Sequence, residues 1–378
     1  MQNKKSIYAD HAATTPLCDA AWAAMTPFLR EEFGNPSSLY SFAKTPREAV
    51  SVARATIAEC IGAKPEEIVF TSGGTESDNW VIKGTDGGLM VSAYEHHAVL
   101  NAAASEASRG REVVYVRPKV GGYLMPETLS KKWSDGIKLV SVMTANNEIG
   151  TVNPIKLLAE LAHKRGALFH TDAVQAVGHI PIDVKEMGAD FLSASGHKFN
   201  GPKGIGFVYI RKGLKLRSLL NGGQQEFGIR AGTENVASIV GMASALKWNC
   251  ENMVAHTKKL NALADMFVDG ISGSVPDAHF PGSGICDQLP GFVSVTLPGH
   301  LAEGLLHLLD LKGIAVSSGA ACDSKNTQVS HVLKAINLPA KLAECTLRVT
   351  FGYGNTTDDV KKILEALTAI LRRGRKVV

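Results

Sequence analysis

The sequence lacks any long run of apolar residues. A helix that crosses a membrane needs roughly 18 consecutive apolar residues, and no stretch of the 378 residues approaches that length. Residues 1–5 are not followed by the apolar segment of a secretory signal. The net charge of +4 is small, so neither a nucleic acid nor a membrane is expected as an obligate partner. We therefore expect a soluble protein of the cytoplasm.

Cysteine is scarce as well, and its spacing excludes several kinds of site. The chain has 6 cysteines with no CxxC pair, and neither they nor the 12 histidines show paired metal-ligand spacing, so no metal site is expected. Scattered cysteines in a chain of this length indicate reduced thiols. Cys322 differs from the others because residues 317–328 are polar and small, which predicts an exposed, mobile loop. A nucleophilic sulfur needs such exposure.

The glycine motifs of nucleotide-binding proteins are also missing. Neither GxxxxGK[ST] nor a GxGxxG that opens a βαβ unit is present, so a nucleotide site is disfavoured. Instead, a β-rich run from Glu67 breaks at Gly73, Gly74 and Thr75 and continues as a helical stretch to Lys83. Glycine lets the backbone approach a ligand closely, and a helix start points free N–H groups at an anion. The segment predicts a phosphate site, with a glycine-rich helix start that binds nothing as the alternative.

One lysine is surrounded by small and hydroxyl-bearing residues. Residues 193–198 read Ser-Ala-Ser-Gly-His-Lys and follow an apolar run. A lysine amine forms a Schiff base with a carbonyl group when desolvation or a nearby cation lowers its pKa, and Ser195 and Gly196 leave room for a cofactor ring beside Lys198. A surface lysine in a turn is the alternative.

An acidic residue ends another apolar run. Residues 167–170 lead into Asp172, which predicts a strand that ends in an acid and turns into a helix, with Gln175 on the same helix face. A carboxylate at the carboxyl edge of an open α/β sheet can keep a pyridine nitrogen protonated. A helix N-cap is the alternative role for Asp172. The phosphate segment, this acid and the lysine together indicate pyridoxal 5′-phosphate (PLP).

The periodicity of the chain predicts its architecture. From about residue 45 to 250, strand-like runs alternate with amphipathic helices, which predicts a parallel sheet with helices on both faces. The run Thr45-Pro46-Arg47-Glu48 has the pattern of a capping box and predicts a helix that opens there and closes at Gly62. After residues 252–256 the pattern changes to that of a smaller α+β domain, whose last helix is expected to begin after residues 356–358.

Seven ordered motifs carry a resemblance to a known family. They occupy residues 10–16, 71–79, 95–100, 146–150, 195–198, 230–235 and 317–322. In these motifs the chain resembles the cysteine desulfurases of the NifS/IscS-like group, which belong to the class V aminotransferase family, from about residue 7 to about residue 370. The resemblance implies the PLP-dependent transferase fold-type I, an α/β fold. Its large domain has a mostly parallel seven-stranded sheet flanked by helices, and its smaller domain is α+β.

The resemblance also assigns domains and site residues. It implies a large PLP-binding domain at residues 15–252 and a small domain at residues 1–14 and 253–378, which carries a mobile cysteine loop at about 317–330. The catalytic residues would be Lys198, which binds the cofactor and moves protons, His96, which stacks on the pyridine ring, and Cys322, which takes the sulfur. The cofactor-binding residues would be Gly74, Thr75, His96, Asn147, Asp172, Gln175, Ser195, His197, Lys198 and Thr233, the last reaching the phosphate of the neighbouring subunit. Asn147 and Arg348 would bind the substrate carboxylate.

Each of these roles has a plainer alternative. His97 is adjacent to His96, and only the resemblance selects His96. Arg348 lies in an alternating run and could be a solvent-facing arginine of an edge strand. Asn147 could cap a turn, and Thr233 could start a helix.

The resemblance implies a homodimer that removes sulfur from L-cysteine, releases L-alanine and holds the sulfur as a persulfide on Cys322. The sulfur would pass to an acceptor protein in iron–sulfur cluster, thio-cofactor or tRNA pathways. Two features depart from the family. Asp323 follows Cys322 and opposes ionisation of its thiol, which Lys325 offsets. The end of the chain also lacks the extended segment with which longer members dock a scaffold, which counts against an iron–sulfur scaffold as the acceptor.

Three other functions are compatible with the same motifs. A selenocysteine lyase performs the same chemistry on selenium and depends less on the loop cysteine. An aminotransferase of this fold needs no Cys322 and requires a keto-acid acceptor. A sulfur-relay interaction protein would mainly dock acceptors and turn over weakly.

Overall fold

The computed structural model describes residues 6–284, 286–318 and 329–374 of the chain. Cys322, Asp323 and Lys325, on which part of the sequence interpretation depends, lie outside the described residues. Among the described residues, no helix is both long and apolar enough to span a lipid bilayer.

The largest sheet has seven strands in the order β2-β8-β7-β6-β5-β3-β4. β8 is antiparallel to both of its neighbours, and the other adjacent pairs are parallel. The mostly parallel seven-stranded α/β sheet expected from the sequence is therefore confirmed. Its strands are β2 (Ile68–Thr71), β3 (Gly88–Ser92), β4 (Val113–Val116), β5 (Ile137–Ser141), β6 (Leu168–Asp172), β7 (Phe191–Ser195) and β8 (Gly206–Ile210).

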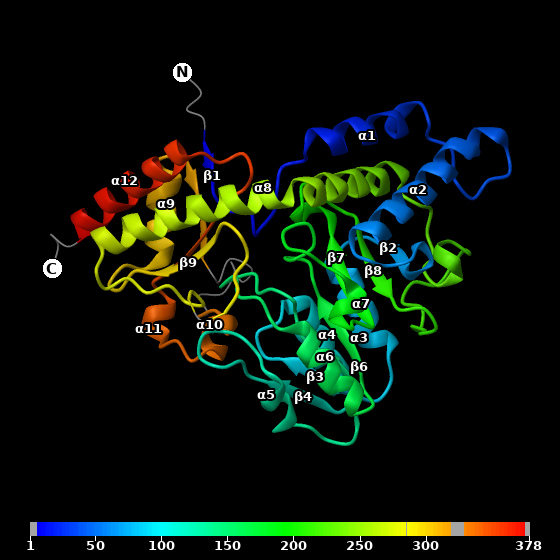
Figure 1. Ribbon diagram of the computed structural model, residues 1–378, viewed down its shortest axis with the longest axis horizontal. Coiled ribbons are helices and arrows are strands. Elements are labelled where there is room, and N and C mark those ends of the chain that lie inside the picture. The colour runs from blue at the N-terminus through cyan, green and yellow to red at the C-terminus, as the bar shows by residue number, and fades with distance from the viewer. Residues whose placement is uncertain (1–5, 285, 319–328, 375–378) are drawn as a thin grey trace.

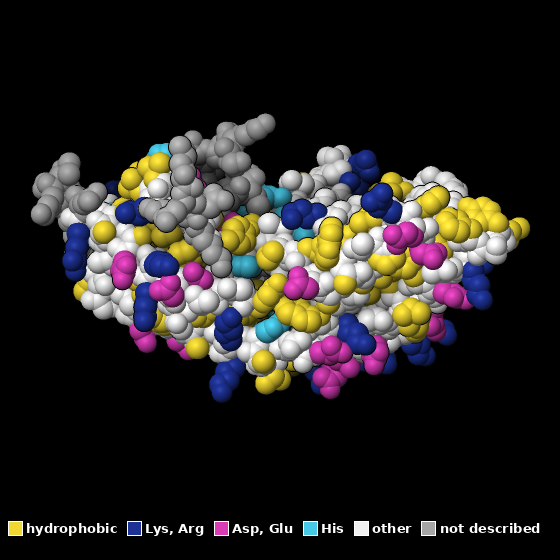
Figure 2. All heavy atoms as spheres, turned by 90° about the horizontal axis from the view of Figure 1, so that it is seen from above, with side chains coloured by type: hydrophobic (Ala, Val, Ile, Leu, Met, Phe, Trp, Pro, Cys, Tyr) yellow, Lys and Arg dark blue, Asp and Glu magenta, His cyan; other side chains and the backbone are white. Residues whose placement is uncertain are grey.

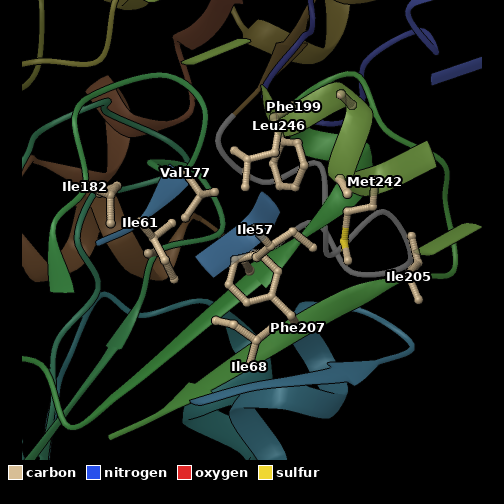
Figure 3. Close-up of a cluster of buried hydrophobic side chains, with 14 of the residues drawn as sticks. Ile57, Ile61, Ile68, Val177, Ile182, Phe199, Ile205, Phe207, Met242 and Leu246 are labelled. Carbon is tan, nitrogen blue, oxygen red and sulfur yellow. The ribbon is translucent and has the colours of Figure 1, made fainter. Parts of the chain in front are cut away.

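Helices cover both faces of this sheet because its inner strands are apolar on both sides. Ile68 and Phe70 of β2 pack in a cluster with α2 and α8, whereas Val69 between them packs in a cluster with α3 and α4. Figure 3 shows the first cluster, in which Ile57 of α2 lies beside Phe207 of β8. The helices of this region are α1 (Asp19–Arg30), α2 (Lys44–Cys60), α3 (Gly74–Gly84), α4 (His97–Ser108), α5 (Pro126–Ser130), α6 (Ile155–Lys164) and α7 (Val184–Met187).

The start of α2 differs from the expected capping box. A 3-10 turn, η1 (Ser41–Ala43), runs directly into α2 at Lys44, and the N-cap residue is Ala43, which makes no side-chain cap. Thr45 therefore lies inside the first turn. The other 3-10 helices are η2 (Pro65–Glu67), η3 (Gly196–Lys198) and η4 (Glu226–Gly228).

The long helix α8 (Val236–Ser274) connects the two parts of the molecule (Figure 1). Its first half packs on α1 and α2, and its later part packs on α12 and β9. The second part contains a three-stranded antiparallel sheet in the order β11-β12-β9 and a parallel pair, β1 with β10. Its elements are β1 (Ile7–Tyr8), β9 (Phe292–Thr296), α9 (Ala302–Asp310), β10 (Ile314–Ala315), β11 (Ser317–Ser318), α10 (His331–Ala335), α11 (Ala340–Ala343), β12 (Thr346–Thr350) and α12 (Thr357–Gly374).

The proposed domain boundary at residues 252 and 253 falls inside α8, which runs through it as one helix. The pairing of β1 with β10 places the start of the chain beside elements of the second part. The division into residues 15–252 and the remainder stays a prediction.

Candidate active site

A cavity of about 570 Å³ opens where several segments of the large sheet meet the second part of the chain. Cavities of a few hundred Å³ with a small number of convergent polar groups are typical ligand sites. It gathers most of the residues expected from the sequence, and the following all line it: Gly74, Thr75, His96, Asn147, Asp172, Gln175, Ser195, His197, Lys198 and Arg348. Thr233 is exposed and does not line the cavity, and Cys322 lies outside the described residues.

Lys198 is the last residue of η3, the short turn that follows β7. Its Nζ donates to the carbonyl oxygens of Ala12 at 2.6 Å and Ala13 at 2.9 Å. Gln175 Nε2 also donates to the Ala12 carbonyl, at 2.9 Å. The N-terminal segment thus holds the lysine amine at the cavity wall.

The turn between β2 and α3 forms one end of the cavity. Gly73, the N-cap of α3, has φ of 148°, a conformation that favours glycine. A Cβ on Gly74 would lie 2.6 Å from Cγ2 of Val174, so a side chain there would crowd the Val174 loop. The start of an 11-residue helix beside Ser195 and His197 suits an anionic group such as a phosphate. Burial lowers the pKa of His197 to about 4, so the ring is neutral, and its Nδ1 lies 3.1 Å from Thr14 Oγ1.

Asp172 ends β6, as the sequence predicts, but the residues that follow it form turns and not a helix. Its Oδ1 accepts from the backbone N–H of Val174 at 2.9 Å, which closes that turn. Burial raises the pKa of Asp172 to about 6. Gln175 therefore reaches the cavity from a turn, and the expected shared helix face does not exist.

The two adjacent histidines have different positions. His96 is the N-cap of α4 and lines the cavity, and its Nδ1 accepts from the N–H of Ala98 at 3.1 Å. Burial, helped by the charge of Lys198, lowers the pKa of His96 to about 4, so the ring is neutral with its proton on Nε2. His97 packs against His331, with ring centroids 4.5 Å apart.

Arg348 is buried in β12, the middle strand of the small sheet, so the solvent-facing alternative is wrong. Its Nη2 donates to Asp10 Oδ1 at 2.8 Å and its Nη1 donates to the Asn147 carbonyl at 2.7 Å. Within the described part of the chain, Arg348 Nε and Asn147 Oδ1 are buried without a hydrogen-bond partner. Both residues line the cavity, so a polar ligand there can satisfy polar groups that the protein leaves open.

These residues fit PLP. A lysine amine faces the cavity, a helix start and Ser195 stand at one end, and a buried carboxylate stands at the end of β6. A neutral histidine ring held by its own helix supplies a flat surface. The roles of the individual residues stay predictions.

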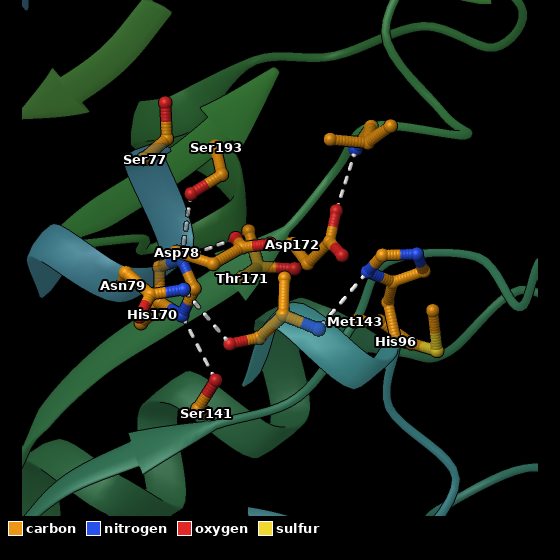
Figure 4. A network of polar contacts seen from close by, with 12 residues as sticks. Ser77, Asp78, Asn79, His96, Ser141, Met143, His170, Thr171, Asp172 and Ser193 are labelled. Atoms are coloured by element: carbon orange, nitrogen blue, oxygen red, sulfur yellow. Dashed lines mark hydrogen bonds and ion pairs between the residues drawn. The ribbon is translucent and has the colours of Figure 1, made fainter. Parts of the chain in front are cut away.

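Sequence reasoning missed several contributors. Asp10 pairs with Arg348 across most of the chain. Three buried side chains, Asp78, Glu95 and His170, belong to the surroundings of Asp172, and Figure 4 shows Asp78 and His170 beside it. The sequence could have indicated His170, because residues two apart in a strand face the same side of the sheet and His170 precedes Asp172 by two. The others depend on tertiary contacts that no local pattern reports.

The comparisons with known proteins agree with this geometry. The family model described as aminotransferase class-V matches residues 7–363. A cysteine desulfurase IscS from Dictyoglomus turgidum is 43% identical over 99% of this chain and 96% of its own length.

Solved structures show the same fold. A NifS-like protein superposes with a TM-score of 0.91 at 34% identity, covering 97% of this chain and 100% of that one. A structure described as SspA in complex with cysteine has a TM-score of 0.81 at 33% identity and covers 92% of this chain and 99% of that one. The chain therefore belongs to the class-V aminotransferase family, whose cysteine desulfurase members depend on PLP.

Proposed function

We propose that this protein is a PLP-dependent cysteine desulfurase that removes sulfur from L-cysteine. The observation that carries the proposal is the single cavity in which Lys198, Asp172, His96 and Arg348 meet. Its support from known proteins is the full-length similarity to relatives named cysteine desulfurase and to a structure described as containing cysteine.

The substrate is held by its carboxylate. Arg348 offers a planar guanidinium whose fork matches a carboxylate, and Asp10 and the Asn147 carbonyl fix its orientation. The open Nε of Arg348 and the side chain of Asn147 complete the binding of the substrate's polar groups. The α-carbon of the substrate then lies toward Lys198.

Bound PLP supplies an electron sink for negative charge at the α-carbon of the substrate. Lys198 removes the α-proton and returns a proton in the later steps. With PLP in the cavity, Asp172 would hold a proton at the ring nitrogen, and the neutral ring of His96 would pack against the cofactor and exclude water. The Cys322 thiolate attacks the substrate sulfur, whose bond to carbon breaks as its S–S bond to Cys322 forms. L-cysteine and the Cys322 thiol thus give L-alanine and a Cys322 persulfide, with no external oxidant or reductant.

The protein acts as a homodimer in this proposal. Exposed apolar side chains gather on α1 and the segment after it: Trp22, Leu29, Phe33, Leu39, Tyr40 and Phe42. Figure 2 shows apolar surface at the end of the molecule where this segment lies. A contiguous apolar patch indicates an interaction surface. Thr233, which is exposed on its own chain, then serves the phosphate of the neighbouring subunit.

The acceptor of the sulfur and a cytoplasmic location remain predictions from the sequence.

The proposal is tested by alanine and sulfide release from L-cysteine in the presence of a thiol reductant, with the visible spectrum recorded. Lys198→Ala and Cys322→Ala should each abolish desulfuration. Cys322→Ala should keep the absorbance of the bound cofactor, because Cys322 has no role in holding it. Turnover of L-cysteine that is absent in the parent protein, or that is indifferent to Cys322→Ala, contradicts the proposal and favours an aminotransferase or a selenocysteine lyase.

A further inference from the structure

Three carboxyl groups are buried together at the cavity, and two of them, Asp78 and Asp172, line it. Asp172 ends β6, Asp78 lies in α3, and Glu95 lies just before α4, with exposed fractions of 4%, 1% and 0%. The electrostatic influence of Asp172 reaches both of the others, and that of Glu95 reaches Asp78. Three buried anions that act on one another in this way would repel strongly, because burial removes the screening that bulk water gives. Their charge states therefore decide the field that the cavity presents.

Asp78 has too few hydrogen-bond donors for an anion. Its Oδ1 is buried without a partner among the described residues. The Asp78 carboxyl group receives a side-chain hydrogen bond from the Ser193 hydroxyl. The nearest titratable nitrogen, His170 Nε2, is 3.7 Å away, which is beyond hydrogen-bond distance. A buried carboxylate is stable when several donors or a cation surround it. Asp78 has neither, and burial raises its pKa well above the ordinary value.

His170 does not supply the missing positive charge. Its ring lies between two hydroxyl groups, with Nδ1 at 2.8 Å from Ser141 Oγ and Nε2 at 3.0 Å from Ser193 Oγ (Figure 4). A hydroxyl group can donate or accept, so both nitrogens of a neutral ring are satisfied. Complete burial lowers the pKa of His170 to about 3.

Glu95, like Asp78, has one carboxyl oxygen without a hydrogen-bond partner. Its Oε1 accepts from the Ser92 hydroxyl and from the N–H of Met143, the latter at 2.7 Å, while Oε2 has no partner in the described structure. A carboxylic acid with its proton on Oε2 accounts for this asymmetry. Burial raises the pKa of Glu95 to about 8.

We propose that Asp78 and Glu95 are held as neutral carboxylic acids, so that Asp172 is the single anion of the three. Both are positioning residues, since they act through Asp172 on the ring nitrogen. This role in the reaction rests on the proposed function, whereas the protonation states themselves do not. The groups that face Asp78 from the elements around it are Asp172, His170, Ser193 and Glu95, and Lys198 is the cation that acts on Asp172.

Neutral acids have a consequence for stability. An acid that keeps its proton when folded and loses it when unfolded makes the protein less stable as pH rises from its unfolded pKa to its folded pKa. For Glu95 that window runs from 4.5 to about 8, and for Asp78 it opens at 3.8. An amide of the same shape removes the penalty.

The test compares the holoprotein with Asp78→Asn by infrared spectroscopy. The parent should show the carbonyl stretch of buried carboxylic acids, shifted in heavy water, and Asp78→Asn should lose part of that band. Asp78→Asn should also melt about 2 °C higher than the parent at pH 8 and at the same temperature near pH 4. Asp86→Asn, an exposed residue just after α3, is the matched control and should change neither measurement. The visible band of the cofactor should persist in Asp78→Asn and shift in Asp172→Asn.

An unchanged carboxylic acid band in Asp78→Asn means that Asp78 is ionised and overturns the proposal. Glu95→Gln provides the same comparison where Asp78→Asn does not fold, and an unchanged band there has the same meaning. Neither infrared absorption nor melting temperature requires cysteine turnover. The proposed function can therefore fail while this assignment stands, and the reverse also holds.

Discussion

His96 is fixed in one orientation and one protonation state by its place at the start of α4. Its Nδ1 caps the helix through the N–H of Ala98, which leaves Nε2–H for the cavity. The ring can therefore cover a cofactor without carrying charge. His97 has a comparable sequence setting, yet it packs against His331.

We expect His96→Gln to lower the rate of alanine formation by ~10²–10⁴-fold, the range for a positioned acid–base group. Glutamine has no aromatic face to cover the cofactor and no ring nitrogen whose proton can be exchanged. Single-turnover assays with bound cofactor measure the effect. His97→Gln is the adjacent control and should change the rate by less than about tenfold, so equal losses in the two variants would contradict the assignment of His96.

Arg348 depends on Asp10 for its orientation, because its Nη2 donates a hydrogen bond to Asp10 Oδ1 at 2.8 Å. Arg348→Lys removes the fork and should raise the KM for L-cysteine by about 10–100-fold, the equivalent of one charged hydrogen bond. Asp10→Asn keeps a hydrogen-bond acceptor and should raise KM by less. If Arg348→Lys leaves the KM for L-cysteine unchanged while Asp10→Asn alters it, Arg348 does not bind the substrate carboxylate.

At this scale, local patterns indicated residues that line one cavity, and they did not indicate the partners of those residues. Lys198, Asp172 and Gly74 stand in recognisable local settings, and all three line one cavity. Asp10 and Arg348 are 338 residues apart, so only the fold shows their pairing. The burial of Asp78 is invisible for the same reason.

Among the elements, β8 is the strand that runs against the others and carries the tightest backbone contact near the site. A Cβ on Gly206 would lie 2.4 Å from the Ala194 carbonyl oxygen and 2.7 Å from Cα of Gly73. Both contacts are backbone atoms, which cannot rotate away. Gly206 therefore lets β8 pass close to the turn that begins α3.

We expect Gly206→Ala to destabilise the protein by about 1–3 kcal/mol, the usual cost of overpacking, and to weaken PLP binding. Urea denaturation and cofactor titration measure the two effects. Gly304→Ala lies in α9 with nothing within 4 Å and should instead stabilise by up to about 1 kcal/mol. If Gly206→Ala leaves the free energy of unfolding and PLP binding unchanged, β8 is able to shift away from the turn that begins α3.

Periodicity predicted most of the helices and strands. The predictions of helix starts were wrong where contacts with a neighbouring segment, and not a local cap, determine the conformation. The alternation of strands and helices gave the large sheet, with Ile68, Val69 and Phe70 facing alternate sides. At the start of α2 the preceding 3-10 turn takes the place of a cap. After Asp172 the acid closes a turn that resembles a helix start in sequence. The helix α12 begins at Thr357, within the stretch expected to precede it, and Thr356 and Asp359 cap it reciprocally.

For the whole molecule, the apolar patch on α1 and residues 33–42 is the surface through which we expect two copies to associate. Leu39 is 99% exposed and Phe33 is 70% exposed. The double variant Phe33→Asp with Leu39→Asp should be a monomer in sedimentation experiments. It should also lose cofactor affinity, because we predict that Thr233 binds the phosphate in the neighbouring subunit. Val254→Asp, on an exposed apolar residue of α8 outside the patch, is the control. A double variant that sediments like the parent would remove this surface from the dimer.

Buried neutral histidines should make the protein sensitive to acid. Burial lowers the pKa of His11 to about 4, so its contribution to stability is present above pH 6.5 and is lost as pH falls toward 4. His11→Asn should lose less stability than the parent between pH 7 and 4.5, by on the order of 2 kcal/mol. Urea denaturation at both pH values gives the difference. His279→Asn, at an exposed position, is the control. An identical pH dependence in His11→Asn and the parent would show that folding does not lower the pKa of His11.

The central claim is that sulfur from L-cysteine comes to rest on Cys322, and mass spectrometry of the intact protein tests it most directly. After one equivalent of L-cysteine without reductant, the parent should gain the mass of one sulfur atom, located on the peptide that contains Cys322, while one equivalent of L-alanine appears. Alanine that forms without added sulfur on that peptide, or sulfur found on a different cysteine, would contradict the account.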